Sequence, residues 1–153
     1  MLYEKLMDFI AEKEGYTENK SVDLESDFSI GYGHKIQEKD PALIAVCGTA
    51  NVTKLSDMEA RLLLWYDICV VGMRKVDNYS STHGYTWTAN QCFALVSVAY
   101  NSSRKYKALM DNLQSGMDPL EAFLLSAEGN PANVINGIRN RRKDEAKIYL
   151  YGF

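Results

Sequence analysis

Three polar residues near the N-terminus have types and spacing suited to acid–base chemistry: Glu14, Asp23 and Ser29. Glu14 lies four residues after Ile10 and seven after Met7, which places it on the apolar stripe of a predicted N-terminal helix. Partial burial and the negative end of the helix dipole both favour a protonated carboxyl group, the form that a proton donor needs. Asp23 and Ser29 fall in a segment rich in polar turn residues, where a carboxylate stays ionised and a hydroxyl can orient water.

Two carboxyl groups held in opposite protonation states are typical of acid–base cleavage of glycosidic bonds. The residues alone leave other interpretations open. Glu14 could instead pair with one of the C-terminal arginines, and Glu25 and Asp27 stand beside Asp23 as rival bases.

The elements that must position these residues are mostly helical. Apolar periodicity predicts a helix over residues 2–13, and an irregular β segment follows at 16–34. A capping box at Ser56–Glu59 opens a long helix that we expect to run to about residue 78, before a polar loop. The remaining predicted helices lie at 42–47, 92–100 (after a second capping box at Thr88–Gln91), 102–113, 120–126 and 131–150.

The chain of 153 residues fits one α+β domain that is mostly α-helical. We expect a small N-terminal β lobe at about 15–55. A larger helical lobe is expected at about 56–153, together with helix 2–13. No apolar run reaches the length of a membrane span, so stable membrane insertion is not expected. The N-terminus shows no signal peptide pattern.

Charge and composition exclude several classes of protein. Three widely spaced cysteines and two histidines predict neither a disulfide framework nor a metal site. A net charge of −3 argues against a nucleic-acid-binding protein. Residues 1–40 carry ten acids and five bases, whereas residues 101–153 carry eight bases and six acids. A basic cluster in that last segment can supply a local attractive surface for anions; it consists of Arg139, Arg141, Arg142, Lys143 and Lys147.

The spacing Glu14-x8-Asp23-x5-Ser29, followed by Ile-Gly-Tyr-Gly-His34, resembles the signature of the phage-type lysozymes and endolysins of glycoside hydrolase family 24. That family has a Glu-x8-Asp-x5-Thr triad before the same Ile-Gly-Tyr-Gly-His. Residues 93–101 are similar to the central buried helix of the family, and residues 137–145 to its closing helix. The resemblance implies a lysozyme-like fold with two lobes joined by the long helix.

The resemblance also implies roles for individual residues. Glu14 would be the general acid, Asp23 the base that activates water, and Ser29 the residue that holds this water. Four further residues are candidates for substrate binding: Tyr32, His34, Asn101 and Arg142. Tyr32 and His34 could line the cleft or be structural, and Asn101 could contact a sugar or cap the end of the central helix. Arg142 is also the preferred partner of Glu14, and a pair between His34 and Asp67 is conceivable.

The implied activity is a muramidase that cleaves the β-1,4 bond between N-acetylmuramic acid and N-acetylglucosamine in the glycan strands of bacterial peptidoglycan, with inversion. We expect a monomer without a cofactor. It would be held in the host cytoplasm until released to the wall, or carried on a virion tail. The alternatives are a lytic transglycosylase and a catalytically inactive wall-binding or tail domain.

Three features depart from the family pattern. Ser29 replaces the usual threonine and so lacks the methyl group that restricts the rotamer. The turn at residues 24–27 lacks the usual glycine and adds two acids beside Asp23. The net negative charge weakens attraction towards an anionic wall polymer.

Overall fold

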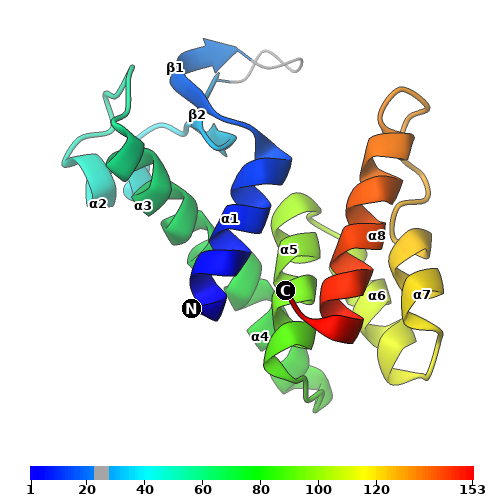
Figure 1. Cartoon of the computed structure of the whole chain (residues 1–153). Coiled ribbons are helices and arrows are strands. Elements are labelled where there is room, and N and C mark those ends of the chain that lie inside the picture. The colour runs from blue at the N-terminus through cyan, green and yellow to red at the C-terminus, as the bar shows by residue number, and fades with distance from the viewer. Residues whose placement is uncertain (23–27) are drawn as a thin grey trace. The chain divides into compact units, whose positions relative to one another are not determined.

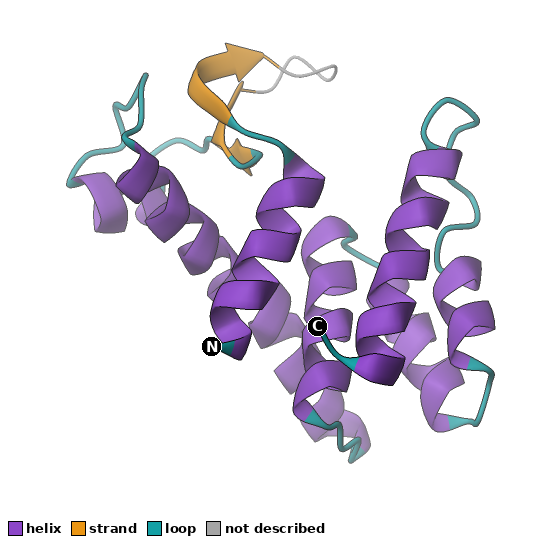
Figure 2. Cartoon of the chain, viewed as in Figure 1, coloured by secondary structure: helices purple, strands orange, loops and turns teal. Residues whose placement is uncertain are grey.

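The computed structural model describes residues 1–22 and 28–153, with only the backbone described for residues 17–22. The chain is mostly helical and has a small antiparallel sheet (Figures 1 and 2). It divides into two compact units. The N-terminal unit comprises Met1 and Tyr3–Cys69, and the C-terminal unit comprises Leu2 and Val70–Phe153.

The N-terminal unit contains every strand of the described chain and three helices. The strands pair antiparallel in the order β1-β2-β3. A buried apolar cluster joins β2 to the helices α2 and α3, and it includes Ile30, Leu43 and Leu63. The elements are α1 (Leu2–Glu14), β1 (Thr17–Val22), β2 (Phe28–Gly31), β3 (His34–Lys35), α2 (Pro41–Cys47) and α3 (Asp57–Asp67).

The predicted capping box at the start of the long helix is confirmed. Ser56 Oγ accepts a hydrogen bond from Glu59 N, and Glu59 Oε1 accepts one from Ser56 N. After α3 the helix continues through a π-helical segment, η1 (Ile68–Met73), and then α4 (Arg74–His83). The helix was predicted to end at about residue 78 but ends at His83, because Gly84, in the left-handed conformation, terminates it.

The C-terminal unit is a helical bundle built around α5 (Ala89–Asn101), which packs against α4, α6 and α8 (Figure 1). Seven consecutive residues of α5, Phe93–Ala99, are buried, which confirms the prediction of a central helix. The other helices are α6 (Lys105–Gln114), α7 (Pro119–Leu125) and α8 (Ile135–Tyr151).

The start of the last helix differs from the prediction. Pro131 does not open α8; instead its carbonyl accepts hydrogen bonds from the N–H groups of Val134 and Ile135, and α8 begins at Ile135. No helix in the described part of the chain is both long enough and apolar enough to cross a membrane.

A close approach between η1 and α5 depends on Gly72. A Cβ atom added to Gly72 would lie 2.9 Å from Val96 Cγ1 and 3.1 Å from the Val96 carbonyl oxygen. A side chain at this position therefore forces packed backbone apart.

We expect Gly72→Ala to lower the free energy of unfolding by about 1–3 kcal/mol, because overpacking outweighs the better helix propensity of alanine. Urea denaturation followed by circular dichroism measures the change. Gly137→Ala is the matched control, since nothing lies within 4 Å of its added Cβ; it should stabilise the protein by up to about 1 kcal/mol. Equal stability of the two variants would contradict the packing argument.

Candidate active site

Glu14 is the last residue of α1, and its carboxylate lies against the β2–β3 turn. Gly15, with φ 71°, ends the helix directly after it. A Cβ atom on Gly33 would lie 3.6 Å from Glu14 Oε2, so the carboxylate oxygen approaches the backbone of the turn. Glu14 is half-buried, whereas Leu6 and Ile10 on the same helix are completely buried. The N-terminal unit thus combines a partly shielded carboxyl group with a glycine turn.

The β2–β3 hairpin carries Ser29 and Tyr32 in different settings. Ser29 lies in the central strand, opposite Ser21 of β1 and Lys35 of β3, and is half-buried. The ring of Tyr32 packs against that of Tyr16, with 5.2 Å between the ring centroids. Glu14 and the hairpin therefore belong to the same unit, as the sequence predicts for one site.

The proposed base, Asp23, lies outside the described residues, as do its rivals Glu25 and Asp27. The described residues on either side of this segment, Val22 and Phe28, are paired across β1 and β2.

His34 is held between two carboxylates. Its Nδ1 lies 2.6 Å from Asp67 Oδ2 and its Nε2 lies 2.8 Å from Asp40 Oδ2. Ionised carboxylates only accept hydrogen bonds, so both ring nitrogens donate and the imidazole is protonated. The pair with Asp67 that the sequence suggested is present. Both nitrogens of His34 are used within the protein.

Asp40 connects His34 to the start of α2. Its Oδ1 accepts hydrogen bonds from the N–H groups of Ala42 and Leu43, while its Oδ2 accepts one from Gln37 N as well as from His34. The side chain is therefore both a helix N-cap and a counter-ion. Sequence analysis missed this residue, although an aspartate directly before a proline at a helix start is a recognisable cap signal.

The charges of this cluster shift the ionisation of its members. Burial lowers the pKa of His34, but hydrogen bonds and charges from Asp67 and Asp40 outweigh it and raise the pKa above the ordinary 6.5. Burial raises the pKa of Asp40, yet the Gln37 N–H, His34 and the Leu43 N–H outweigh it and lower the pKa below the ordinary 3.8. The cluster is therefore most stable when His34 is charged and Asp40 ionised.

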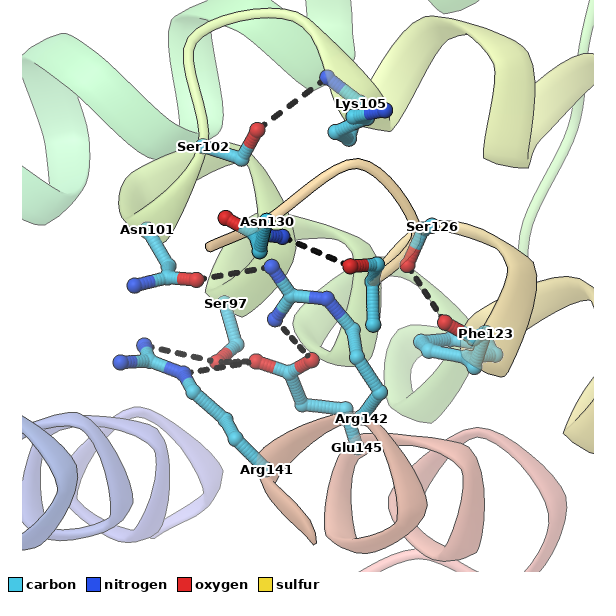
Figure 3. Close-up of polar contacts among 11 residues, drawn as sticks. Ser97, Asn101, Ser102, Lys105, Phe123, Ser126, Asn130, Arg141, Arg142 and Glu145 are labelled. Carbon is cyan, nitrogen blue, oxygen red and sulfur yellow. Dashed lines mark hydrogen bonds and ion pairs between the residues drawn. The ribbon is translucent and has the colours of Figure 1, made fainter. Parts of the chain in front are cut away.

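The C-terminal unit buries a second charged cluster, on α8 and α5 (Figure 3). Glu145 is completely buried and accepts hydrogen bonds from Arg142 Nη1 at 2.7 Å, Arg141 Nε at 3.0 Å and Ser97 Oγ at 2.6 Å. Removing one member of such a cluster leaves an uncompensated buried charge, at a cost of about 3–5 kcal/mol. Arg142, itself 1% exposed, is therefore a structural cation.

The same cluster fixes Asn101 at the end of α5. Arg142 Nη2 donates to Asn101 Oδ1 at 2.7 Å, as Figure 3 shows. Because a guanidinium group only donates, the Asn101 amide must present its oxygen to Arg142. Asn101 is an exposed residue, so its NH₂ group is the part left to meet a ligand.

The sequence-predicted residues thus fall in two places. Glu14, Ser29, Tyr32 and His34 belong to the N-terminal unit, while Asn101 and Arg142 belong to the C-terminal unit. Within residues 1–22 and 28–153, no group of three or more His, Cys, Asp or Glu side chains is arranged to hold a metal ion.

Comparison with known proteins identifies a family and a fold. The sequence model of the phage lysozyme family matches residues 11–145. The structure is similar to an endolysin from Escherichia coli O157:H7 phage FAHEc1, with a TM-score of 0.71 and 23% identity over 100% of this chain and 95% of that chain. It is also similar to the muramidase domain of SpmX from Asticaccaulis excentricus, with a TM-score of 0.71 and 19% identity over 98% and 97% of the two chains. A mutant of P22 lysozyme gives a TM-score of 0.70 and 18% identity over 95% of each chain.

These similarities confirm a lysozyme-like fold. Among curated proteins, none matches this sequence.

The His34 cluster predicts a stability that depends on pH. The raised pKa of His34 means that its contribution is complete below about pH 6.5 and is lost as the pH rises through the folded-state pKa. The lowered pKa of Asp40 means that its contribution is complete above about pH 3.8 and is lost as the pH falls through the folded-state pKa. We expect maximum stability between these limits.

At about pH 5, His34→Gln should lower the free energy of unfolding by about 3–5 kcal/mol, because two buried carboxylates lose their counter-ion. The difference from the wild type should shrink as the pH rises, since the wild-type imidazole then loses its charge. Urea denaturation at several pH values measures this. A difference that stays constant up to about pH 9 would show that the charge of His34 does not stabilise the fold.

Proposed function

This chain belongs to the phage lysozyme family, and from that premise we propose that it hydrolyses the glycan strands of bacterial peptidoglycan. The scissile bond is the β-1,4 bond between N-acetylmuramic acid and N-acetylglucosamine. The observation that carries the proposal is the family match over residues 11–145, together with the Glu14 carboxylate at the Gly33 turn.

Glu14 supplies the proton in the proposed reaction. Its half-buried carboxyl group lies where α1 ends, beside the Gly33 turn. The proton passes to the glycosidic oxygen as the bond from the anomeric carbon to that oxygen breaks. A positioned general acid typically raises the rate of such a step by about 10²–10⁴-fold.

Asp23 and Ser29 act on water in this proposal. Asp23 accepts a proton from a water molecule whose oxygen attacks the anomeric carbon from the face opposite the leaving group. The Ser29 hydroxyl, on the central strand, orients that water. Direct attack inverts the configuration, which requires about 6.5–9.5 Å between the two carboxyl groups.

The other predicted residues divide into sugar contacts and positioning residues. The outward NH₂ of Asn101 can donate to an acetamido or hydroxyl oxygen, and Tyr32 offers a half-buried ring beside the turn. Arg142 acts through Asn101, and His34 acts through the hairpin that it holds. We assign no cofactor to the reaction.

Release to the wall is part of the proposal. A free endolysin would remain in the host cytoplasm until the membrane is opened, whereas a tail-associated enzyme would be delivered with the virion. Both routes lead to the same glycan substrate.

We expect Glu14→Gln to lower the release of soluble fragments from purified peptidoglycan by about 100- to 10,000-fold, since the amide cannot donate the catalytic proton. Mass spectrometry of the fragments identifies the reaction. Reducing N-acetylmuramic acid ends, absent with Glu14→Gln, support the hydrolase. Anhydro ends identify a transglycosylase, and no fragments from several wall types identify a binding domain. A variant that cuts at the parental rate would refute the role of Glu14.

Ser29→Thr should maintain or raise activity. Threonine keeps the hydroxyl, restricts its rotamer and suits a central strand. Ser29→Ala, which removes only the hydroxyl, is the control and should lose activity. Fragment release by the two variants, measured beside the wild type, tests the role of the hydroxyl. If Ser29→Thr released as few fragments as Ser29→Ala, a residue other than Ser29 would have to hold the attacking water.

A further inference from the structure

A cationic pocket lies within the C-terminal unit. It has a volume of about 450 Å³ and opens between α4 and the start of α6. Its cations are Arg74 and Lys75, at the start of α4, and Lys107, in the first turn of α6. Among the described residues that line the pocket, none is an aspartate or a glutamate. The volume falls within the range of small-molecule sites, about 300–1,000 Å³.

Several basic side chains outside the pocket form ion pairs. Arg61 pairs with Asp8, and Arg139 pairs with Glu128. In the part of the chain that the structure describes, no carboxylate pairs with the cations of the pocket. Uncompensated positive charge in a concave site attracts an anion.

Asp111 could have neutralised Lys107, because the two are four residues apart on α6. Instead, both oxygens of Asp111 accept hydrogen bonds from Tyr79 Oη, at 2.9 and 3.0 Å, and one also accepts from Tyr85 Oη at 2.8 Å. Burial, followed by Asp111, raises the pKa of Tyr79 to about 12, so this hydroxyl remains a donor. Asp111 thus hydrogen-bonds to two tyrosines and forms no ion pair with Lys107.

Aromatic rings position the lysines without neutralising them. Lys107 Nζ lies 5.9 Å from the centroid of the Tyr79 ring and 6.0 Å from that of Tyr106, and Lys75 Nζ lies 5.8 Å from the Tyr106 centroid. These are cation–π distances. Lys75 also donates to the Ala99 carbonyl at 3.2 Å, which leaves further N–H donors on its ammonium group.

We propose that this pocket binds the carboxylates of peptide-substituted muramic acid, as a second contact to the wall made by residues other than those proposed for the reaction. The proposal rests on the proposed function. The cations match a carboxylate. The rings of Tyr79 and His83, with 3.9 Å between their centroids and 33° between their planes, offer aromatic surface for the apolar parts of an acylated sugar. A second contact on the same polymer raises the effective concentration of the wall around the enzyme.

The probe is muramyl dipeptide, titrated into the whole ¹⁵N-labelled chain and followed by NMR. It should shift the amide resonances of α4 and of the first turn of α6. Arg74→Gln/Lys107→Gln should weaken this binding by about tenfold. Lys143→Gln/Lys147→Gln, which removes the same charge from exposed positions of α8, is the matched control and should bind as the wild type does.

Three results would overturn the proposal. Uncharged chitotetraose could shift the same resonances equally, which would show that no carboxylate is needed. Inorganic phosphate could displace the probe completely at similar concentration, which would show that the pocket binds any small anion. The control could weaken binding as much as the pocket variant, which would show an effect of net charge alone.

The titration needs no cleavage, so its failure is separable from that of the proposed function. A chain that binds muramyl dipeptide in this pocket but releases no wall fragments would keep the pocket and refute the hydrolase. A chain that releases fragments but binds equally well with and without Arg74 and Lys107 would keep the hydrolase and refute the pocket.

Discussion

The protonated imidazole of His34 constrains the whole N-terminal unit. A buried cation must be compensated, and here two carboxylates do so from different elements: Asp40 at the start of α2 and Asp67 at the end of α3. His34 itself begins β3, so one ion cluster joins the sheet to both helices. Gly33, the residue beside the Glu14 carboxylate, directly precedes His34. The turn under the proposed acid is therefore held by charge as well as by packing.

The C-terminal unit also compensates a buried charge, but there the central charge is negative and its partners are positive. There a buried anion, Glu145, is compensated by two arginines and a serine from α8 and α5. In both clusters each charged group hydrogen-bonds to a group of opposite charge, so each cluster is specified by geometry as well as by charge. The consequence for function is similar in each unit. In the N-terminal unit the charge of His34 holds the glycine turn beside Glu14. In the C-terminal unit the charge of Arg142 orients the Asn101 amide.

Local signals predicted most of the fold, and long-range contacts account for what was missed. The capping boxes at Ser56 and Thr88 involve residues three apart, so they are readable in the sequence and are confirmed. Gly72 looks like an unfavourable residue in a helix until the approach of Val96 is known. The hydrogen bonds from Gln37, Ala42 and Leu43 to Asp40 are local and readable from an aspartate before a proline. The pair of His34 with Asp67, 33 residues away, depends instead on how β3 meets α3. The spacing of Glu14 and Ser29 is likewise local and resembles the family signature, while the roles of these residues stay a prediction.

The basic cluster near the C-terminus shows why charge counted along a sequence differs from charge presented to a ligand. Arg141 and Arg142 are buried against Glu145, and Arg139 pairs with Glu128, so these three arginines already have carboxylate partners. Of the five cations, only Lys143 and Lys147 are both exposed and without a carboxylate partner in the described part of the chain. The concentrated positive charge lies elsewhere, around α4 and α6. For a protein of net charge −3, attraction to an anionic polymer therefore depends on where unpaired cations gather, and the pocket of Arg74, Lys75 and Lys107 is such a place.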